Sequence, residues 1–74
     1  MEMNHRIRQY IKSNGMTFTL VAEKAGIELK KFSRMMTGRQ KIDTDEYELI
    51  CKALSVAPTY FFAKKFLETQ NLSA

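Results

Sequence analysis

The segment from Phe18 to Thr37 restricts the possible folds of this 74-residue chain more than any other segment. Val21, Ala22 and Ala25 place small and apolar side chains on one face of a helix. Ala22 is small enough to let a second helix cross closely. Gly26 follows at the point where the first helix must end, because a residue without Cβ adopts the left-handed conformation there without strain. The pattern therefore predicts a short helix that ends in a tight turn.

A second helix is predicted directly after this turn, from about Glu28 to Thr37. Phe32 and Met35 face inward at helical spacing, and the opposite face is mostly basic. The residues expected to point outward are Leu29, Lys30, Lys31 and Arg34. Two helices joined by a short turn that contains glycine form a helix-turn-helix, here residues 18–37, whose second helix enters the major groove of DNA.

Positive charge is concentrated on the same segment. The chain has 12 Lys and Arg residues against 8 Asp and Glu, which gives a net charge of +4. Five of the basic residues and none of the acidic ones lie between Leu29 and Lys41, so the rest of the chain has seven bases against eight acids. This distribution favours a polyanionic partner for the second helix and the loop after it. The alternative is a solvated basic face that binds no partner.

The remaining patterns predict an all-α domain that spans residues 1–74 and has five helices. Asn4 is expected to cap a first helix that ends at Gly15, and Thr17 to cap the first helix of the motif. Asp43 and Glu46 form a capping box in front of a fourth helix. The apolar residues of this fourth helix recur at intervals of three and four, as Tyr47, Ile50, Cys51 and Leu54.

A fifth helix is predicted from about Pro58, whose ring favours the first position of a helix. This helix carries more large apolar side chains than a core already built by four helices can use. The surplus side chains, those of Phe62, Phe66 and Leu67, are expected either to form a dimerisation surface or to fold back over the core.

Several classes of protein are not expected. Cys51 is the only cysteine, so no intrachain disulfide can form, and a cytoplasmic location is expected. No apolar run approaches the ~20 residues that span a bilayer, and the N-terminus alternates charged and apolar residues, unlike a signal peptide. His5 is alone on its helix, without the Cys or acidic residues that would complete a site. We therefore expect no enzyme, no metal site and no cofactor, and a solvent-facing His5.

A set of positions between Ile7 and Phe62 matches a known family pattern, most closely in the strings VAEKAGI and KALSV. The matching residues are Thr17, Val21, Ala22, Gly26, Ile27, Phe32, Ser33, Gly38, Ile50, Leu54 and Val56. On these residues the chain resembles the phage repressor and Cro-like (XRE-type) helix-turn-helix family. The resemblance implies a compact five-helix bundle of the lambda-repressor-like DNA-binding type, in which helices 2 and 3 form the helix-turn-helix.

The chain departs from the family pattern at two pairs of positions. The family often has glutamine at the start of both motif helices, where Phe18 and Leu29 stand here. Phe18 is interpreted as either a filler at the edge of the core or a surface contact, and Leu29 could pack on a thymine methyl group. Many members also pair an arginine with a glutamate at the positions of Ile11 and Met36. Because both residues are apolar here, we expect a repacked core.

The predicted DNA contacts fall into three groups. Leu29, Lys30 and Arg34 are expected to read bases, because Lys30 and Arg34 lie one turn apart and either can donate to guanine O6 and N7. The residues expected near the bases or the backbone are Glu28, Lys31 and Ser33. The residues expected to contact phosphate are Thr17, Thr19, Thr37, Arg39 and Lys41.

The preferred hypothesis is sequence-specific binding of double-stranded DNA by a homodimeric transcriptional repressor or regulator. The alternative is a protein-interaction module, such as an antitoxin or antirepressor, on the same scaffold. Apolar residues that could serve this alternative are Phe18, Leu20 and Leu29.

Overall fold

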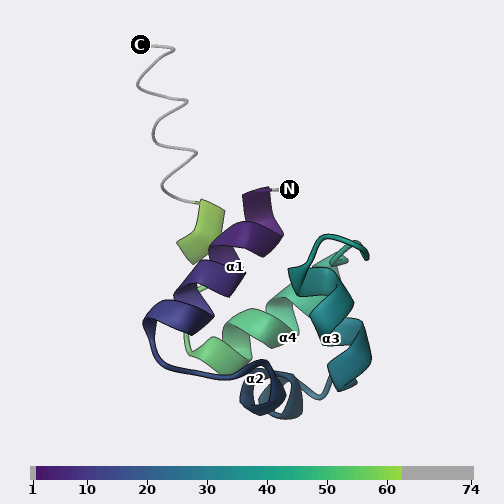
Figure 1. Cartoon of the computed structure of the whole chain (residues 1–74). Coiled ribbons are helices and arrows are strands. Elements are labelled where there is room, and N and C mark those ends of the chain that lie inside the picture. The colour runs from purple at the N-terminus through teal and green to yellow at the C-terminus, as the bar shows by residue number, and fades with distance from the viewer. Residues whose placement is uncertain (1, 63–74) are drawn as a thin grey trace.

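The computed structural model describes residues 2–62, and all regular structure in that range is helical (Figure 1). The four complete helices are α1 (Glu2–Ser13), α2 (Phe18–Ala25), α3 (Leu29–Met36) and α4 (Thr44–Leu54). Helical conformation begins again at Tyr60 and continues to the last described residue, Phe62. These elements confirm the predicted all-α class. None of the helices among residues 2–62 is long and apolar enough to cross a bilayer.

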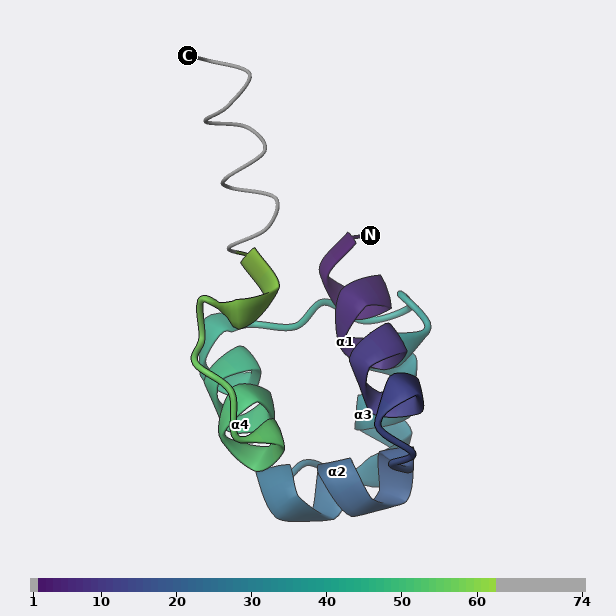
Figure 2. The same ribbon diagram turned by 90° about the vertical axis from the view of Figure 1, so that its left-hand side faces the viewer.

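The helices enclose one core between them. Helix α2 packs against both α3 and α4, and α1 packs against α3. Figure 2 shows α1 and α4 on opposite sides of the core, with α2 crossing beneath both. The buried side chains come from every helix and are those of Ile7, Ile11, Val21, Ala22, Ala25, Phe32, Met35, Met36, Tyr47, Ile50, Cys51, Leu54 and Phe61. The inward faces predicted for the motif helices and for α4 are thus confirmed.

The helix-turn-helix geometry depends on how α2 starts and ends. Thr17 caps α2, as predicted, because its Oγ1 accepts a hydrogen bond from the backbone N–H of Leu20 at 3.1 Å. At the other end, Gly26 has a φ of 73°, and the N–H of Ile27 reaches back to the carbonyl of Ala22 at 3.0 Å. This Schellman arrangement satisfies carbonyls at the end of the helix and turns the chain sharply into α3.

The predicted capping box of α4 is also confirmed. The backbone N–H of Glu46 donates to Asp43 Oδ1 at 2.8 Å, and the backbone N–H of Asp43 donates to Glu46 Oε1 at 3.3 Å. Two backbone N–H groups at the start of this helix are therefore each satisfied by a side chain three residues away. The loop between α3 and α4 is anchored at its α4 end.

Two predicted helix starts were wrong. Asn4 does not cap α1, which begins at Glu2; its Nδ2 instead donates to the carbonyl of Met36 at 3.1 Å. This contact ties α1 to the C-terminus of α3, where carbonyls lack partners within the helix. Pro58 is not the first residue of the fifth helical segment, because it lies in a turn two residues before Tyr60.

The residues at which the chain departs from the family pattern have two different environments. Ile11 and Met36 are both fully buried, so the expected repacked core is present. Phe18 is half-buried and contacts Phe32 edge to face, with ring centroids 5.6 Å apart. This packing favours the interpretation of Phe18 as a filler at the edge of the core.

Candidate nucleic-acid interface

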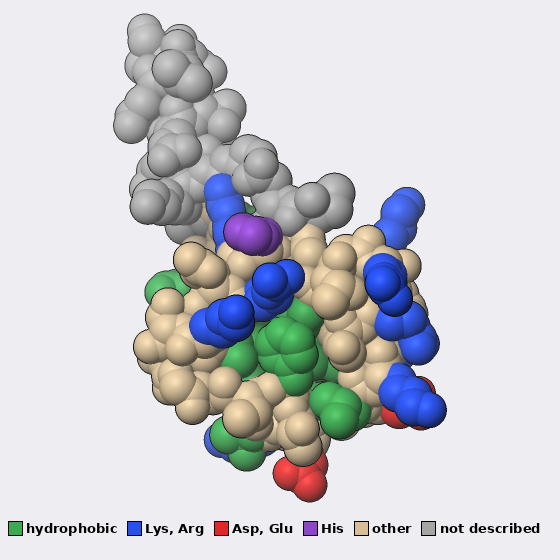
Figure 3. Space-filling view, viewed as in Figure 1, with side chains coloured by type: hydrophobic (Ala, Val, Ile, Leu, Met, Phe, Trp, Pro, Cys, Tyr) green, Lys and Arg blue, Asp and Glu red, His purple; other side chains and the backbone are tan. Residues whose placement is uncertain are grey.

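One face of helix α3 packs in the core, and the opposite face is exposed to solvent. Phe32, Met35 and Met36 anchor it in the core, while Leu29, Lys30 and Arg34 are exposed. Three of the four side chains predicted to point outward are thus exposed, whereas Lys31 is half-buried. In Figure 3 the Lys and Arg side chains gather along the edge formed by α3 and the loop after it, and a second group lies over α1. Lys30 and Arg34, two of the predicted base-reading residues, belong to α3 and are exposed.

Arg34 is held by a hydrogen bond from within the protein. Its Nε–H donates to Gln40 Oε1, in the loop after α3, at 3.1 Å. Among residues 2–62, Arg34 forms no ion pair with Glu28 or another acid. Lys30, one turn earlier, is exposed. Two cationic side chains one turn apart therefore reach the same outer surface.

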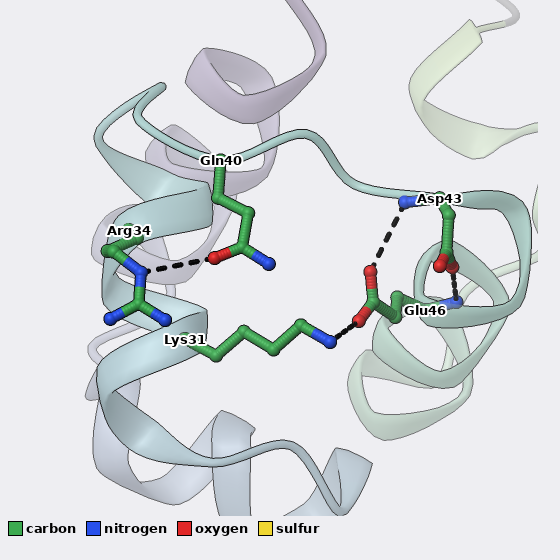
Figure 4. A network of polar contacts seen from close by, with 5 residues as sticks. All are labelled: Lys31, Arg34, Gln40, Asp43 and Glu46. Atoms are coloured by element: carbon green, nitrogen blue, oxygen red, sulfur yellow. Dashed lines mark hydrogen bonds and ion pairs between the residues drawn. The ribbon is translucent and has the colours of Figure 1, made fainter.

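Lys31 points toward α4, unlike Lys30 and Arg34. Its ammonium forms an ion pair with Glu46, the residue that also closes the capping box with Asp43 (Figure 4). The hydrogen bond to the Glu46 carboxylate, and the negative charge of that group, raise the pKa of Lys31 above its ordinary value. Lys31 is thereby tied to the start of α4. No local sequence pattern indicates this pair, because its members lie on separate helices.

The residues predicted to contact phosphate differ in what their polar groups are free to do. Thr17 uses its hydroxyl oxygen as an acceptor, so its proton can still be donated to a phosphate. The single hydroxyl proton of Thr37 lies between the carbonyls of Ser33 at 3.1 Å and Arg34 at 3.2 Å. Thr37 can donate to a phosphate only by giving up these contacts. The remaining members of this group, Thr19, Arg39 and Lys41, are all exposed.

Glu28 and Ser33, predicted to lie near the bases or the backbone, occupy different positions on α3. Glu28 is the N-cap residue of α3, and its exposed side chain makes no capping hydrogen bond. Its carboxylate lies at the positive end of the helix dipole, where it is favourable for the helix but repels phosphate. Ser33 is half-buried. Only Glu28 thus adds negative charge to the otherwise basic face.

The predicted dimerisation residues are only partly described. Phe62 is 48% exposed and stacks on Tyr47, with ring centroids 5.4 Å apart. It lines an open hollow of about 670 Å³ between α1, the loop after α3 and the start of α4, together with Met3, Ile42 and Tyr47. Phe66 and Leu67 lie outside the described residues.

Two titratable residues, Cys51 and Tyr47, lie in the core, and burial shifts the pKa of each. Burial raises the pKa of the Cys51 thiol, which makes its reactive thiolate scarce. Burial also raises the pKa of Tyr47, whose hydroxyl donates to the carbonyl of Pro58 at 2.6 Å. His5 is exposed. In residues 2–62 no three His, Cys, Asp or Glu side chains converge as a metal site would require.

The comparison with protein-family models matches residues 6–60 to the Cro/C1-type HTH DNA-binding domain. This match covers most of α1, all of α2, α3 and α4, and the start of the fifth helical segment. Comparisons with curated proteins and with solved structures found no match.

Proposed function

Because the chain belongs to the Cro/C1-type helix-turn-helix family of DNA-binding domains, we propose that it binds specific sequences of double-stranded DNA with α3 in the major groove. The observation that carries this proposal is the division of α3 into two faces. One face is locked in the core by Phe32, Met35 and Met36, and the other presents Lys30 and Arg34 to solvent. A rigid helix with two exposed cations is suited to base reading.

Base and phosphate contacts have separate roles in this proposal. Lys30 and Arg34 donate to guanine O6 and N7, and Leu29, which is 44% exposed, packs on a thymine methyl group. Phosphate contacts from the start of α2 and from the loop after α3 set the register of the protein without reading sequence. The residues that make them are Thr17, Thr19, Arg39 and Lys41.

The biological role that we propose is a cytoplasmic transcriptional regulator, most simply a repressor, formed by the single domain 1–74 acting as a homodimer. The exposed ring of Phe62 supports a self-association surface, which Phe66 and Leu67 would extend. A two-fold dimer places its two copies of α3 about 34 Å apart and favours a near-palindromic site.

Selection from a randomised pool of duplexes tests this function and gives the half-site spacing. On the selected site, Arg34→Ala is expected to cost ~1 to 3 kcal/mol of binding free energy and to relax one base position. Lys41→Ala is expected to weaken all sequences alike and to lower the salt dependence by about one counterion. Failure of both substitutions to change binding would contradict the assigned contacts.

A protein-interaction module, of the antitoxin or antirepressor kind, is the second candidate. It is favoured by two exposed leucines on the motif, Leu20 at 41% and Leu29 at 44%. Binding to random duplex DNA distinguishes the two candidates, because phosphate contacts release counterions and give a steep salt dependence. The absence of any salt-dependent binding would favour the interaction module.

A further inference from the structure

Gln40 is joined to Arg34 through both its backbone and its side chain. The backbone N–H of Gln40 donates to the carbonyl of Arg34 at 3.2 Å, and Arg34 Nε–H donates to Gln40 Oε1 at 3.1 Å (Figure 4). The neighbouring N–H of Arg39 donates to the same carbonyl at 2.9 Å. The start of the loop is therefore fixed to the last turn of α3, and Gln40 is fixed with it.

Gln40 is the more enclosed member of this pair. Gln40 is half-buried and lines the hollow beside α4, whereas Arg34 is exposed. Gly38, with a φ of 84°, turns the chain so that Gln40 returns alongside α3. A loop side chain that is held at its base can restrict a long exposed arginine, which on its own samples many rotamers.

The hydrogen bond uses one edge of the guanidinium and leaves another open. Arg34 Nε–H can only donate, so the amide oxygen of Gln40 must be the atom that faces it. Both Nη groups remain without a hydrogen bond or ion pair to the described part of the chain. These two groups form the end of the planar fork, which matches the paired acceptors O6 and N7 of guanine.

We infer that Gln40 is a positioning residue that holds the Arg34 guanidinium ready to read guanine, an inference that rests on the proposed DNA-binding function. Gln40 acts through Arg34 and need not touch a base. An arginine that is ordered before DNA arrives loses less conformational freedom on binding. The guanine specificity of the protein thus depends on a residue outside the recognition helix.

Two substitutions at Gln40 separate its hydrogen-bonding role from its packing role. Gln40→Met keeps the length of the side chain but removes the acceptor, whereas Gln40→Glu keeps an acceptor for Arg34. Binding is measured on the selected site and on the same site with the Arg34-contacted guanine replaced. Gln40→Met is expected to lower affinity for the selected site roughly 3- to 10-fold and to reduce discrimination for guanine. Gln40→Glu is expected to keep discrimination while weakening binding to every sequence, because its charge repels phosphate.

The Arg34→Ala background shows whether Gln40 acts through Arg34. There, Gln40→Met is expected to cause no further loss, because the group that it positions is gone. An equal loss with and without Arg34, or undiminished guanine discrimination in Gln40→Met, would overturn the inference.

An NMR measurement on the free protein makes the test independent of DNA. The Arg34 Nε–H signal is expected to exchange slowly with water in the wild type and in Gln40→Glu, and faster in Gln40→Met. Equal exchange in all three proteins would overturn the inference even if DNA binding is normal. If the wild type selects no DNA site but the exchange rates differ as expected, the proposed function fails while the contact between Gln40 and Arg34 stands.

Discussion

At the scale of single residues, Lys31 shows that a cation on the recognition helix can be engaged by the protein itself. The Glu46 carboxylate raises the pKa of Lys31, so the charged ammonium is favoured in the folded state. The stability that this pair contributes is therefore complete below the pKa of Lys31 in the unfolded chain. It is lost as the pH rises through the raised pKa of the folded state.

Glu46→Gln tests this pair by removing the negative charge and keeping the size of the side chain. The pKa of Lys31 is expected to fall toward its value in the unfolded chain when the carboxylate is replaced, and the alkaline loss of stability that comes from this pair is expected to disappear. An NMR titration of the Lys31 side chain in the wild type and in Glu46→Gln measures this change. An unchanged pKa for Lys31 would show that the pair does not persist in solution.

Whether a threonine hydroxyl can donate to phosphate depends on the hydrogen bonds that it already makes within the protein. Residue type alone does not determine these bonds. Thr17 and Thr37 were both predicted to contact phosphate, because either hydroxyl can donate. Thr17 accepts from Leu20 N–H and keeps its proton, whereas Thr37 directs its proton toward carbonyls of α3. The difference arises because one threonine precedes a helix and the other follows one.

At the scale of helices, α4 ends on the one non-glycine residue with positive φ among residues 2–62. Ser55 has a φ of 59° and a ψ of 40°, and its N–H and that of Val56 bond back to carbonyls of α4. A left-handed conformation costs an L-residue roughly 1–2 kcal/mol, whereas glycine adopts it freely at an entropic cost of about 0.5–1 kcal/mol. Ser55→Gly is therefore expected to raise the free energy of unfolding by about 0.5–1 kcal/mol.

Urea unfolding measures this gain, and Gly26→Ala is the matched control. A Cβ at Gly26 would meet no atom within 4 Å, so the substitution adds backbone strain without a steric clash. It is expected to lower the free energy of unfolding by about 0.5–1 kcal/mol, because the lower entropy of the unfolded chain offsets part of the strain. Ser55→Gly would contradict this account of helix ends if it proved less stable than the wild type.

Local signals explain why the helices and most of the core could be predicted from the sequence. Thr17 and the pair Asp43 and Glu46 act on backbone groups within three residues, and the inward stripe of α3 repeats within one helix. Asn4 was misplaced because asparagine also favours caps. Its actual partner, the carbonyl of Met36, is 32 residues away and is brought near only by folding.

In the candidate site, too, local features could be predicted from the sequence and long-range contacts could not. The exposure of Leu29, Lys30 and Arg34 follows from helical periodicity, so it could be predicted. The partner of Arg34 could not, because it depends on how the loop after Gly38 returns to α3. The partner of Lys31 depends on the packing of α4 beside α3. Sequence patterns thus identify candidate side chains, and tertiary packing decides which remain free.

At the scale of the whole molecule, the position of the recognition helix depends on an apolar contact region between α1 and α3. Ile11 on α1 and Met36 on α3 are both completely buried in the same core. The related family members often pair arginine with glutamate at these positions. Well-packed apolar groups often replace a buried ion pair without loss of stability, whereas one unpaired buried charge is costly.

Met36→Glu is accordingly expected to lower the free energy of unfolding by about 3–5 kcal/mol at neutral pH. The loss is expected to be smaller in acid, because the buried carboxyl group is then neutral. Adding Ile11→Arg to the same chain supplies a partner for the charge and is expected to recover part of the loss. Urea unfolding of the wild type, both single variants and the double variant measures the coupling between the two positions. A double variant no more stable than Met36→Glu alone would show that α1 and α3 do not bring these two side chains together, and that the apolar pair contributes to the core independently.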